Sequence, residues 1–172
     1  RVAKDHPGPF DEMSRREHAD HVDELAERTS LPPADGAAVC VMDTGVNRGH
    51  PMLEGLLAAS DCHASRAEWG TSDHEGHGTG MAGLASYGDL TPLFAGRAPV
   101  RLTHRLESVK ILPPHGNNPP TLYGEITAEG VQAPERAAPE RRRVFQLAVT
   151  ARAGGRDRGR PSSWSATLDA LA

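Results

Sequence analysis

The stretch AAVCVMDTGV, residues 37–46, joins a continuous apolar run to an acidic residue at its end. An apolar run of this length without polar alternation is typical of a strand that is buried on both faces of a parallel sheet. Asp43 would then lie at the carboxyl end of the strand, where open α/β sheets place their ligands and their chemistry. This stretch therefore predicts both the type of sheet and the edge that carries the function.

The rest of the chain alternates between helical and strand-like patterns. Spacing of apolar residues and turn signals predict helices over residues 11–29, 50–59, 77–86, 122–132 and 162–172, and strands over residues 37–43, 100–106, 107–112 and 143–151. Polar loops are expected over residues 60–76, 113–120 and 152–161. Such alternation favours an α/β fold with a mainly parallel sheet between two helical layers. Only three or four strands can be counted, so we expect an incomplete three-layer α/β/α domain.

Charge and composition exclude several classes of partner. A net charge of −4 gives no reason to expect binding to nucleic acid or to an anionic membrane. The basic clusters ERRR (140–143) and RAGGRDRGR (152–160) are interpreted as solvated loops. No stretch approaches the ~18 apolar residues that a membrane-spanning helix needs.

Two cysteines, Cys40 and Cys62, are too few for a disulfide framework in a chain of 172 residues, so we expect free thiols. The chain begins with Arg1 and carries no apolar leader, which indicates a piece of a longer protein. Together these features favour a cytoplasmic location.

The stretch SDHEGHGTGMAGLAS, residues 72–86, places His77 at the junction of a loop and a helix. The helix dipole disfavours a protonated imidazole at this end, which suits a base better than an inert surface residue. If Asp43 accepts a hydrogen bond from one ring nitrogen, the other nitrogen is left to accept a proton. The alternative is a buried histidine that a backbone carbonyl satisfies.

The neighbours of His77 have simpler interpretations. Asp73, His74 and Glu75 are expected to form a polar rim. Met81, Leu84 and Ala85 have helical spacing and are expected to supply the larger apolar contacts of the helix. Because glycine weakens a helix by up to ~1 kcal/mol relative to alanine, Gly78, Gly80 and Gly83 predict close packing of this helix beneath the site.

Each motif alone leaves alternatives open. The tripeptide DTG at Asp43 also makes a good turn, and aspartic peptidases use it to pair two carboxylates. Those enzymes are all-β, whereas this chain alternates strands and helices. A phosphate-binding loop does not fit, because GHGTGMAG lacks the lysine of that motif.

The two motifs together are more specific. DTGVNRGHP after an apolar strand, an interval of 34 residues from Asp43 to His77, and HGTGMAGLA resemble the subtilases, the subtilisin-like serine peptidases. ESVKILP (107–113) resembles the strand that follows the histidine helix in that family. RVFQLAVT (143–150) resembles the strand whose end lines the S1 pocket in that family. The resemblance covers residues 36–172, and residues 1–35 are expected to form an N-terminal helix and a linker.

The resemblance implies roles for single residues. Asp43 and His77 would be two members of a Ser-His-Asp triad, and Ala148, Val149 and Thr150 would offer backbone hydrogen bonds to an extended substrate. The family's serine motif, G-T-S-(M/F)-A-x-P, and its oxyanion asparagine are missing from these 172 residues. GTS does occur at 70–72, but Ser72 is followed by DHEGH instead of a small-residue helix, and Ser162, Ser163 and Ser165 lack the motif. The nucleophile is therefore expected beyond Ala172.

The expected function is that of a serine endopeptidase acting on polypeptides, held here as a fragment that is inactive without the rest of its catalytic domain. One alternative is a catalytically inactive or split module that binds proteins. Another is a metal-dependent hydrolase, whose candidate ligands are Asp61, His63, Asp73, His74, Glu75 and His77. HEGH does not have the H-E-x-x-H spacing of metallopeptidases, so no metal is expected at the site. No cofactor is expected; the resemblance is compatible with structural calcium, but no run of ligands identifies it.

Overall fold

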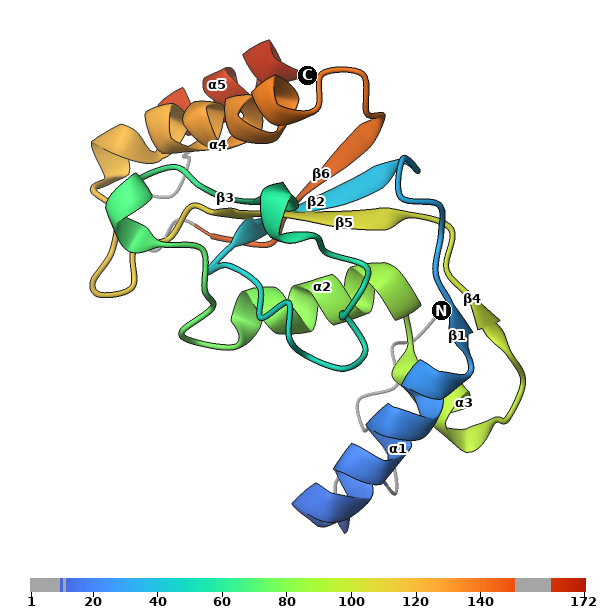
Figure 1. Cartoon of the computed structure of the whole chain (residues 1–172). Helices are drawn as coiled ribbons and strands as arrows, with labels where there is room; N and C mark the ends of the chain where they lie inside the picture. The colour runs from blue at the N-terminus through green and yellow to red at the C-terminus, as the bar shows by residue number, and fades with distance from the viewer. Residues whose placement is uncertain (1–9, 11, 151–161) are drawn as a thin grey trace.

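A four-stranded parallel sheet forms the centre of the molecule. The structure, a computed structural model, describes residues 10, 12–150 and 162–172 (Figure 1). The strand order is β3-β5-β2-β6, in which β2 (Ala38–Asp43) lies between β5 (Arg105–Lys110) and β6 (Arg143–Leu147), and β3 (Cys62–Ala64) pairs with β5. The prediction of a parallel sheet with a buried strand ending at Asp43 is confirmed.

Helices cover both faces of this sheet, so the predicted α/β/α layering is also confirmed. Two helices, α4 (Tyr123–Ala137) and α5 (Ser163–Leu171), lie over one face, and α2 (His77–Tyr87) lies over the other (Figure 1). Short 3-10 turns occupy Ala59–Asp61, Ala67–Trp69 and Pro120–Leu122.

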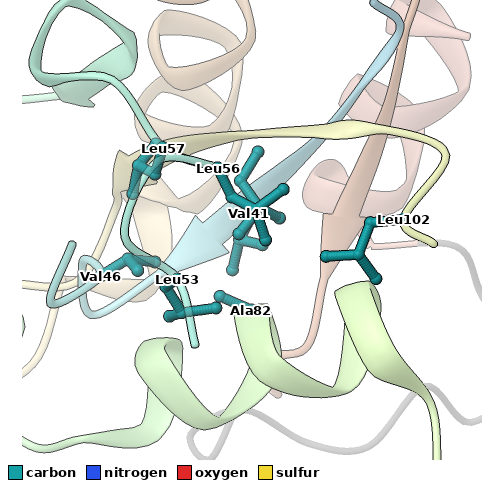
Figure 2. Close-up of a cluster of buried hydrophobic side chains, with 8 residues drawn as sticks. Val41, Val46, Leu53, Leu56, Leu57, Ala82 and Leu102 are labelled. Atoms are coloured by element: carbon teal, nitrogen blue, oxygen red, sulfur yellow. The ribbon is translucent and has the colours of Figure 1, made fainter. Parts of the chain in front are cut away.

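The two faces of β2 supply two separate cores. Val41 points toward α2 and packs with buried residues of the turns after β2 and with Ala82 and Leu102 (Figure 2). Cys40 and Met42 point the opposite way and pack with residues of β5 and with Ile126 and Val131 of α4. This alternation is the period of two expected for a strand.

An N-terminal unit lies to one side of the sheet (Figure 1). Its helix α1 (Arg15–Glu27) contacts α3 (Leu90–Ala95), and a two-stranded parallel sheet joins β1 (Thr29–Ser30) to β4 (Val100–Arg101). Helix α1 is shorter than the predicted 11–29, because Ser14 caps it in a reciprocal capping box with Glu17.

The helix predicted over residues 50–59 is wrong, since this segment forms a series of turns. Hydrogen bonds from the amides of Leu53 and Glu54 to the carbonyl of His50 begin a helical turn. Gly55 then adopts a left-handed φ of +79°, so the chain does not continue as a helix beyond this first turn. Leu53, Leu56 and Leu57 are nevertheless buried, so their apolar character serves the core without a helix.

Other boundaries also differ from the prediction. The polar loop 60–76 contains the short strand β3, and the strand predicted over 143–151 ends at Leu147. Helix α4 runs beyond the predicted 122–132 and includes the buried Pro134 near its end. In α5, Trp164 packs inward as predicted, whereas Leu168 and Leu171 are more than a third exposed. Residues 152–161 lie outside the described ranges.

The interpretation of ERRR (140–143) as a solvated loop is wrong for two of its arginines. Arg143 donates to Glu107 at 2.9 Å, and Arg141 lies 3.0 Å from both Glu107 and Asp61. Arg143 also donates to the backbone carbonyls of Pro134 and Ala138. These four side chains, Asp61, Glu107, Arg141 and Arg143, form a buried ionic cluster that joins β5 to the start of β6.

Two further predictions concern the thiols and the membrane. Cys40 is buried, Cys62 is half-buried, and both are free, as predicted. Within the described ranges, no helix combines the length and the apolar composition that a bilayer crossing requires.

Candidate active site

Asp43 and His77 lie together at the carboxyl end of the sheet. Asp43 is the last residue of β2 and is fully buried, and His77 is the first residue of α2. The Nδ1 atom of His77 is 2.8 Å from Oδ1 and 2.9 Å from Oδ2 of Asp43. With an ionised carboxylate this geometry requires the imidazole proton on Nδ1. The imidazole side chain stays half-exposed, and the described residues make no hydrogen bond to Nε2.

Two glycines let the strand end and the helix start approach each other. Gly45 has a φ of +98°, and a Cβ there would lie 2.5 Å from the carbonyl oxygen of Thr71. A Cβ on Gly78 would lie only 2.0 Å from the carbonyl oxygen of Gly45. Any larger side chain at either position would push apart the segments that carry Asp43 and His77.

The prediction of close packing is correct for Gly78 and wrong for Gly80 and Gly83. A Cβ at Gly80 or Gly83 would meet nothing within 4 Å. Both glycines line a second cavity of about 590 Å³, which is also lined by residues of α1 and α3. Leu84 is 54% exposed, so α2 buries its small residues and leaves a large one outside, contrary to the predicted apolar contact.

Thr44 connects the strand end to the helix. Its backbone amide donates to Oδ1 of Asp43 at 2.7 Å. Its hydroxyl oxygen accepts from the amide of Gly78 at 2.9 Å and donates to Oδ1 of Asp73, also at 2.9 Å. One residue thus contacts the buried acid, the first turn of α2 and the preceding loop.

The prediction of a polar rim is wrong for Asp73, which is a central acceptor of the site. Its carboxylate accepts hydrogen bonds from the amides of Glu75, Gly76 and Thr79 and from the hydroxyls of Thr44 and Thr79. Partial burial acts to raise the pKa of Asp73, but these hydrogen bonds outweigh it and lower the pKa to about 2. Asp73 is therefore ionised at neutral pH.

Lys110 is the residue of β5 that pairs with Asp43 across the sheet. It is 1% exposed, and its Nζ donates to the carbonyl oxygen of Ser72 at 2.7 Å. Burial lowers the pKa of Lys110, while the negative charges of Asp73 and Glu75 act in the opposite direction. The lysine thereby ties the loop before α2 to the sheet.

A cavity of about 470 Å³ opens beside His77. Thr44, Glu75 and His77 form one part of its wall, and the first turns of α4 and Trp164 of α5 contribute apolar surface. Ala148, Val149 and Thr150 line the same cavity, directly after β6 ends. The half-exposed imidazole and an irregular backbone segment therefore face one common space.

The family model of the subtilases matches residues 34–172. The chain belongs to the subtilase family. No curated protein and no solved structure matches it. Subtilases are a peptidase family, so the chain carries a peptidase-type domain. The match begins near the predicted domain boundary at residue 36, and the division into 1–35 and 36–172 stays a prediction.

The serines of this subtilase chain are not at the histidine. Ser72 is exposed, and its carbonyl is the acceptor for Lys110. Ser162 caps α5 by accepting from the amide of Ser165. In the ranges 12–150 and 162–172, no serine hydroxyl is hydrogen-bonded to His77.

Metal ligation was a second interpretation of the histidines in this subtilase. His63 lies in β3, His74 lies in the loop before α2, and the Nδ1 atom of His77 is taken by Asp43. Among the residues that the structure describes, no group of three or more His, Cys, Asp or Glu side chains is placed to hold a metal ion.

Sequence reasoning found the Asp43–His77 pair of the subtilase site and missed the residues around it. The sequence patterns do not single out Thr44, Lys110 or Thr79, and they predict Asp73 only at a polar rim. An acid shortly before a glycine-rich helix start is a capping signal, and this signal could have identified Asp73. Lys110 carries no such signal, because its partner Ser72 is distant in the sequence.

Proposed function

We propose that this chain supplies two of the three catalytic residues of a serine-type endopeptidase, with His77 as the general base and Asp43 as its orienting acid. The observation that carries the proposal is the buried carboxylate of Asp43 on Nδ1 of an imidazole whose other side faces a cavity. A base needs one nitrogen fixed and the other accessible. Membership of a peptidase family supports the same assignment.

In this proposal Nε2 of His77 takes the proton from a serine hydroxyl as the hydroxyl oxygen attacks the peptide carbonyl. The imidazole then carries a positive charge beside the carboxylate of Asp43. Because Asp43 is fully buried, little water screens this attraction, and the protonated imidazole is stabilised while the bond forms. His77 later returns the proton to the leaving amine.

The nucleophile is proposed to come from polypeptide beyond Ala172. Ser72 is unsuitable because the segment around it is held by other contacts: Lys110 binds its carbonyl and Asp73 caps the adjacent helix. The remainder of the catalytic domain is thus the proposed first partner of this chain. Alone, the 172 residues are proposed to be inactive.

The proposed substrate is an extended polypeptide in the cavity beside His77. Ala148, Val149 and Thr150 line the cavity and lie outside the regular strand, so their backbone groups are not committed to the sheet. Extended peptides bind to such segments through main-chain hydrogen bonds. The apolar surface around Trp164 would hold a substrate side chain.

The test compares two proteins: this 172-residue chain and a longer product, expressed from the parent reading frame, that continues beyond residue 172. A fluorophosphonate probe reacts with an activated serine, so we expect it to label the longer product and to leave the 172-residue chain unlabelled. Labelling of the longer product should disappear in the His77→Ala variant. Mass spectrometry locates the labelled residue.

Two results would overturn the proposal. Labelling of the short chain at Ser72 would place the nucleophile within these residues. An unlabelled longer product that still binds peptides would indicate the non-catalytic alternative, a subtilase-like module that acts in protein binding.

A further inference from the structure

The start of α2 has an unusual cap. Its N-cap residue is Gly76, which has a left-handed φ of 83° and no side chain to accept the free amides of the first turn. The first amides of a helix have no partner within the helix and need acceptors from elsewhere. At α2, Thr44 accepts from the amide of Gly78, and Asp73 accepts from the amide of Thr79. The cap is therefore supplied by two residues outside the helix.

These two capping residues are also bonded to each other. The hydroxyl of Thr44 donates to Oδ1 of Asp73 at 2.9 Å, and Oδ2 of Asp73 accepts from the Thr79 amide at 2.9 Å and hydroxyl at 2.5 Å. The Thr79 hydroxyl oxygen in turn accepts from the amide of Asn47. The network thus runs from the residues after β2 to the first turn of α2.

Thr44 directly follows Asp43 in the chain, and His77 directly precedes Gly78. Any movement of the Thr44–Asp73–Thr79 network changes the separation of the Asp43 carboxylate and the His77 ring. We propose that Asp73 is a positioning residue, which holds the first turn of α2 so that the imidazole of His77 stays on Asp43. This inference rests on the proposed function for its catalytic meaning, although the geometry it describes is independent of catalysis.

The carboxylate form is needed because Asp73 accepts five hydrogen bonds and donates none. Both oxygens of Asp73 accept hydrogen bonds. In Asp73→Asn one of them is replaced by an NH2 group, which is a donor and would face the N–H or O–H donors around that position. The negative charge also lies at the N-terminus of α2, where the helix dipole favours it. Asparagine matches the shape of aspartate and loses both features.

The experiment uses proton NMR on the 172-residue chain. A proton shared between an imidazole nitrogen and a buried carboxylate gives a resonance at low field, and Asp43→Asn identifies the His77 signal by removing it. In Asp73→Asn we expect this resonance to be lost or broadened, and the amide of Thr79 to exchange with solvent at least about tenfold faster. Circular dichroism checks that the variant remains folded.

The matched control is Glu68→Gln, which removes the same charge from an exposed residue of the same loop. It should leave both the low-field resonance and the Thr79 exchange rate unchanged. A second pair of variants covers the case in which Asp73→Asn does not fold. Thr79→Val removes the hydroxyl that donates to Asp73 and should broaden the low-field resonance. Thr79→Ser keeps this hydroxyl, so its resonance should match that of the wild type.

An unchanged resonance and an unchanged Thr79 exchange rate in folded Asp73→Asn would overturn the inference. A folded Thr79→Val variant whose low-field resonance matches that of the wild type would also overturn the inference. In a parent protein that is active, Asp73→Asn should lower kcat by about 10²-fold with KM little changed, since a small misplacement of a catalytic group costs this much. An inactive parent would refute the proposed function and leave the NMR result as a separate test of Asp73.

Discussion

Two fully buried carboxylates on neighbouring strands have opposite surroundings. Asp43 at the end of β2 is 0% exposed, and Glu107 within β5 is 1% exposed. Glu107 faces the guanidinium groups of Arg141 and Arg143, whereas Asp43 faces the half-exposed imidazole of His77. The same functional group is thus enclosed by permanent cations in one region and paired with a titratable ring in the other.

The two carboxylates therefore differ in the chemistry and in the exposure of their partners. Arginine stays protonated at any relevant pH, and Arg143 is further held by two backbone carbonyls, so the Glu107 cluster has no proton to exchange. An imidazole, unlike a guanidinium, has a neutral form that can accept a proton, and His77 has one side open to a cavity. Burial of an acid therefore indicates catalysis only together with the chemistry and the exposure of its partner.

The largest effect is expected from Asp43→Asn in the parent protein. The amide cannot hold the Nδ1 proton as the carboxylate does, so the imidazole is left in the wrong tautomer and its protonated form loses its counter-ion. We expect kcat to fall by about 10⁴-fold, equivalent to about 5.5 kcal/mol. Peptide hydrolysis measures this, and a loss below tenfold would contradict the proposed role.

Glu107→Gln tests the other carboxylate, and its effect should be on stability. The substitution leaves Arg143 buried without its carboxylate, which typically costs about 3–5 kcal/mol. Urea unfolding of the 172-residue chain measures the loss. The matched control is Glu54→Gln at an exposed position, which should change the free energy of unfolding by less than about 0.5 kcal/mol. A similar small change at Glu107 would mean that the cluster is not structural.

Gly78→Ala and Gly83→Ala should act in opposite directions. The added methyl group at Gly78 meets the Gly45 carbonyl, and relieving that overlap should cost about 1–3 kcal/mol. At Gly83 the methyl group meets nothing, so the higher helix propensity of alanine should stabilise the chain by up to ~1 kcal/mol. Thermal unfolding compares the two. Equal effects would contradict the close contact that joins the segments of Asp43 and His77.

The smallest effect is expected on the stability of the fold when the pH is lowered from 4 to 2. The pKa of Asp73 is about 2 in the folded chain and 3.8 ordinarily, so its stabilisation is present above pH 4 and is lost as the pH falls toward 2. Since Asp73 is partly exposed, we expect this contribution to be about 1 kcal/mol after solvent screening. The stability difference between wild type and Asp73→Asn should therefore narrow between pH 4 and pH 2. A constant difference would show that the charge has no role.

Local patterns in the sequence predict the central features of this fold. The continuous apolar run before Asp43 predicts β2, because a strand covered on both faces needs apolar residues without alternation. The start of α2 at His77 follows from the change between a polar loop and small apolar residues. The resemblance of the two motifs and their interval to the subtilases predicts that Asp43 and His77 lie together, as they do in the structure.

The rest depends on contacts between distant segments. The sequence predicts a solvated loop at Arg141 and Arg143, because their ion-pair partners Glu107 and Asp61 are far away in the sequence. Gly55 ends the expected helix through a left-handed φ, and sequence alone does not distinguish this from a tolerated glycine. The role of Asp73 likewise appears only when the fold brings Thr44 beside it.

The pairing of the strands has a consequence for how the chain reaches this structure. Ala38 of β2 pairs with Arg105 on one side and with Arg143 on the other, so the central sheet is made of contacts between remote segments. Folds dominated by such contacts form slowly, because long loops must close before the contacts stabilise them. Asp43 and His77 belong to the nearer crossover, between β2 and β5, while the Glu107 cluster also needs the segment that leads into β6. We therefore expect φ-values near Asp43 and His77 to exceed those at Arg141 and Arg143, with the Asp43–His77 pair assembled before the ionic cluster closes.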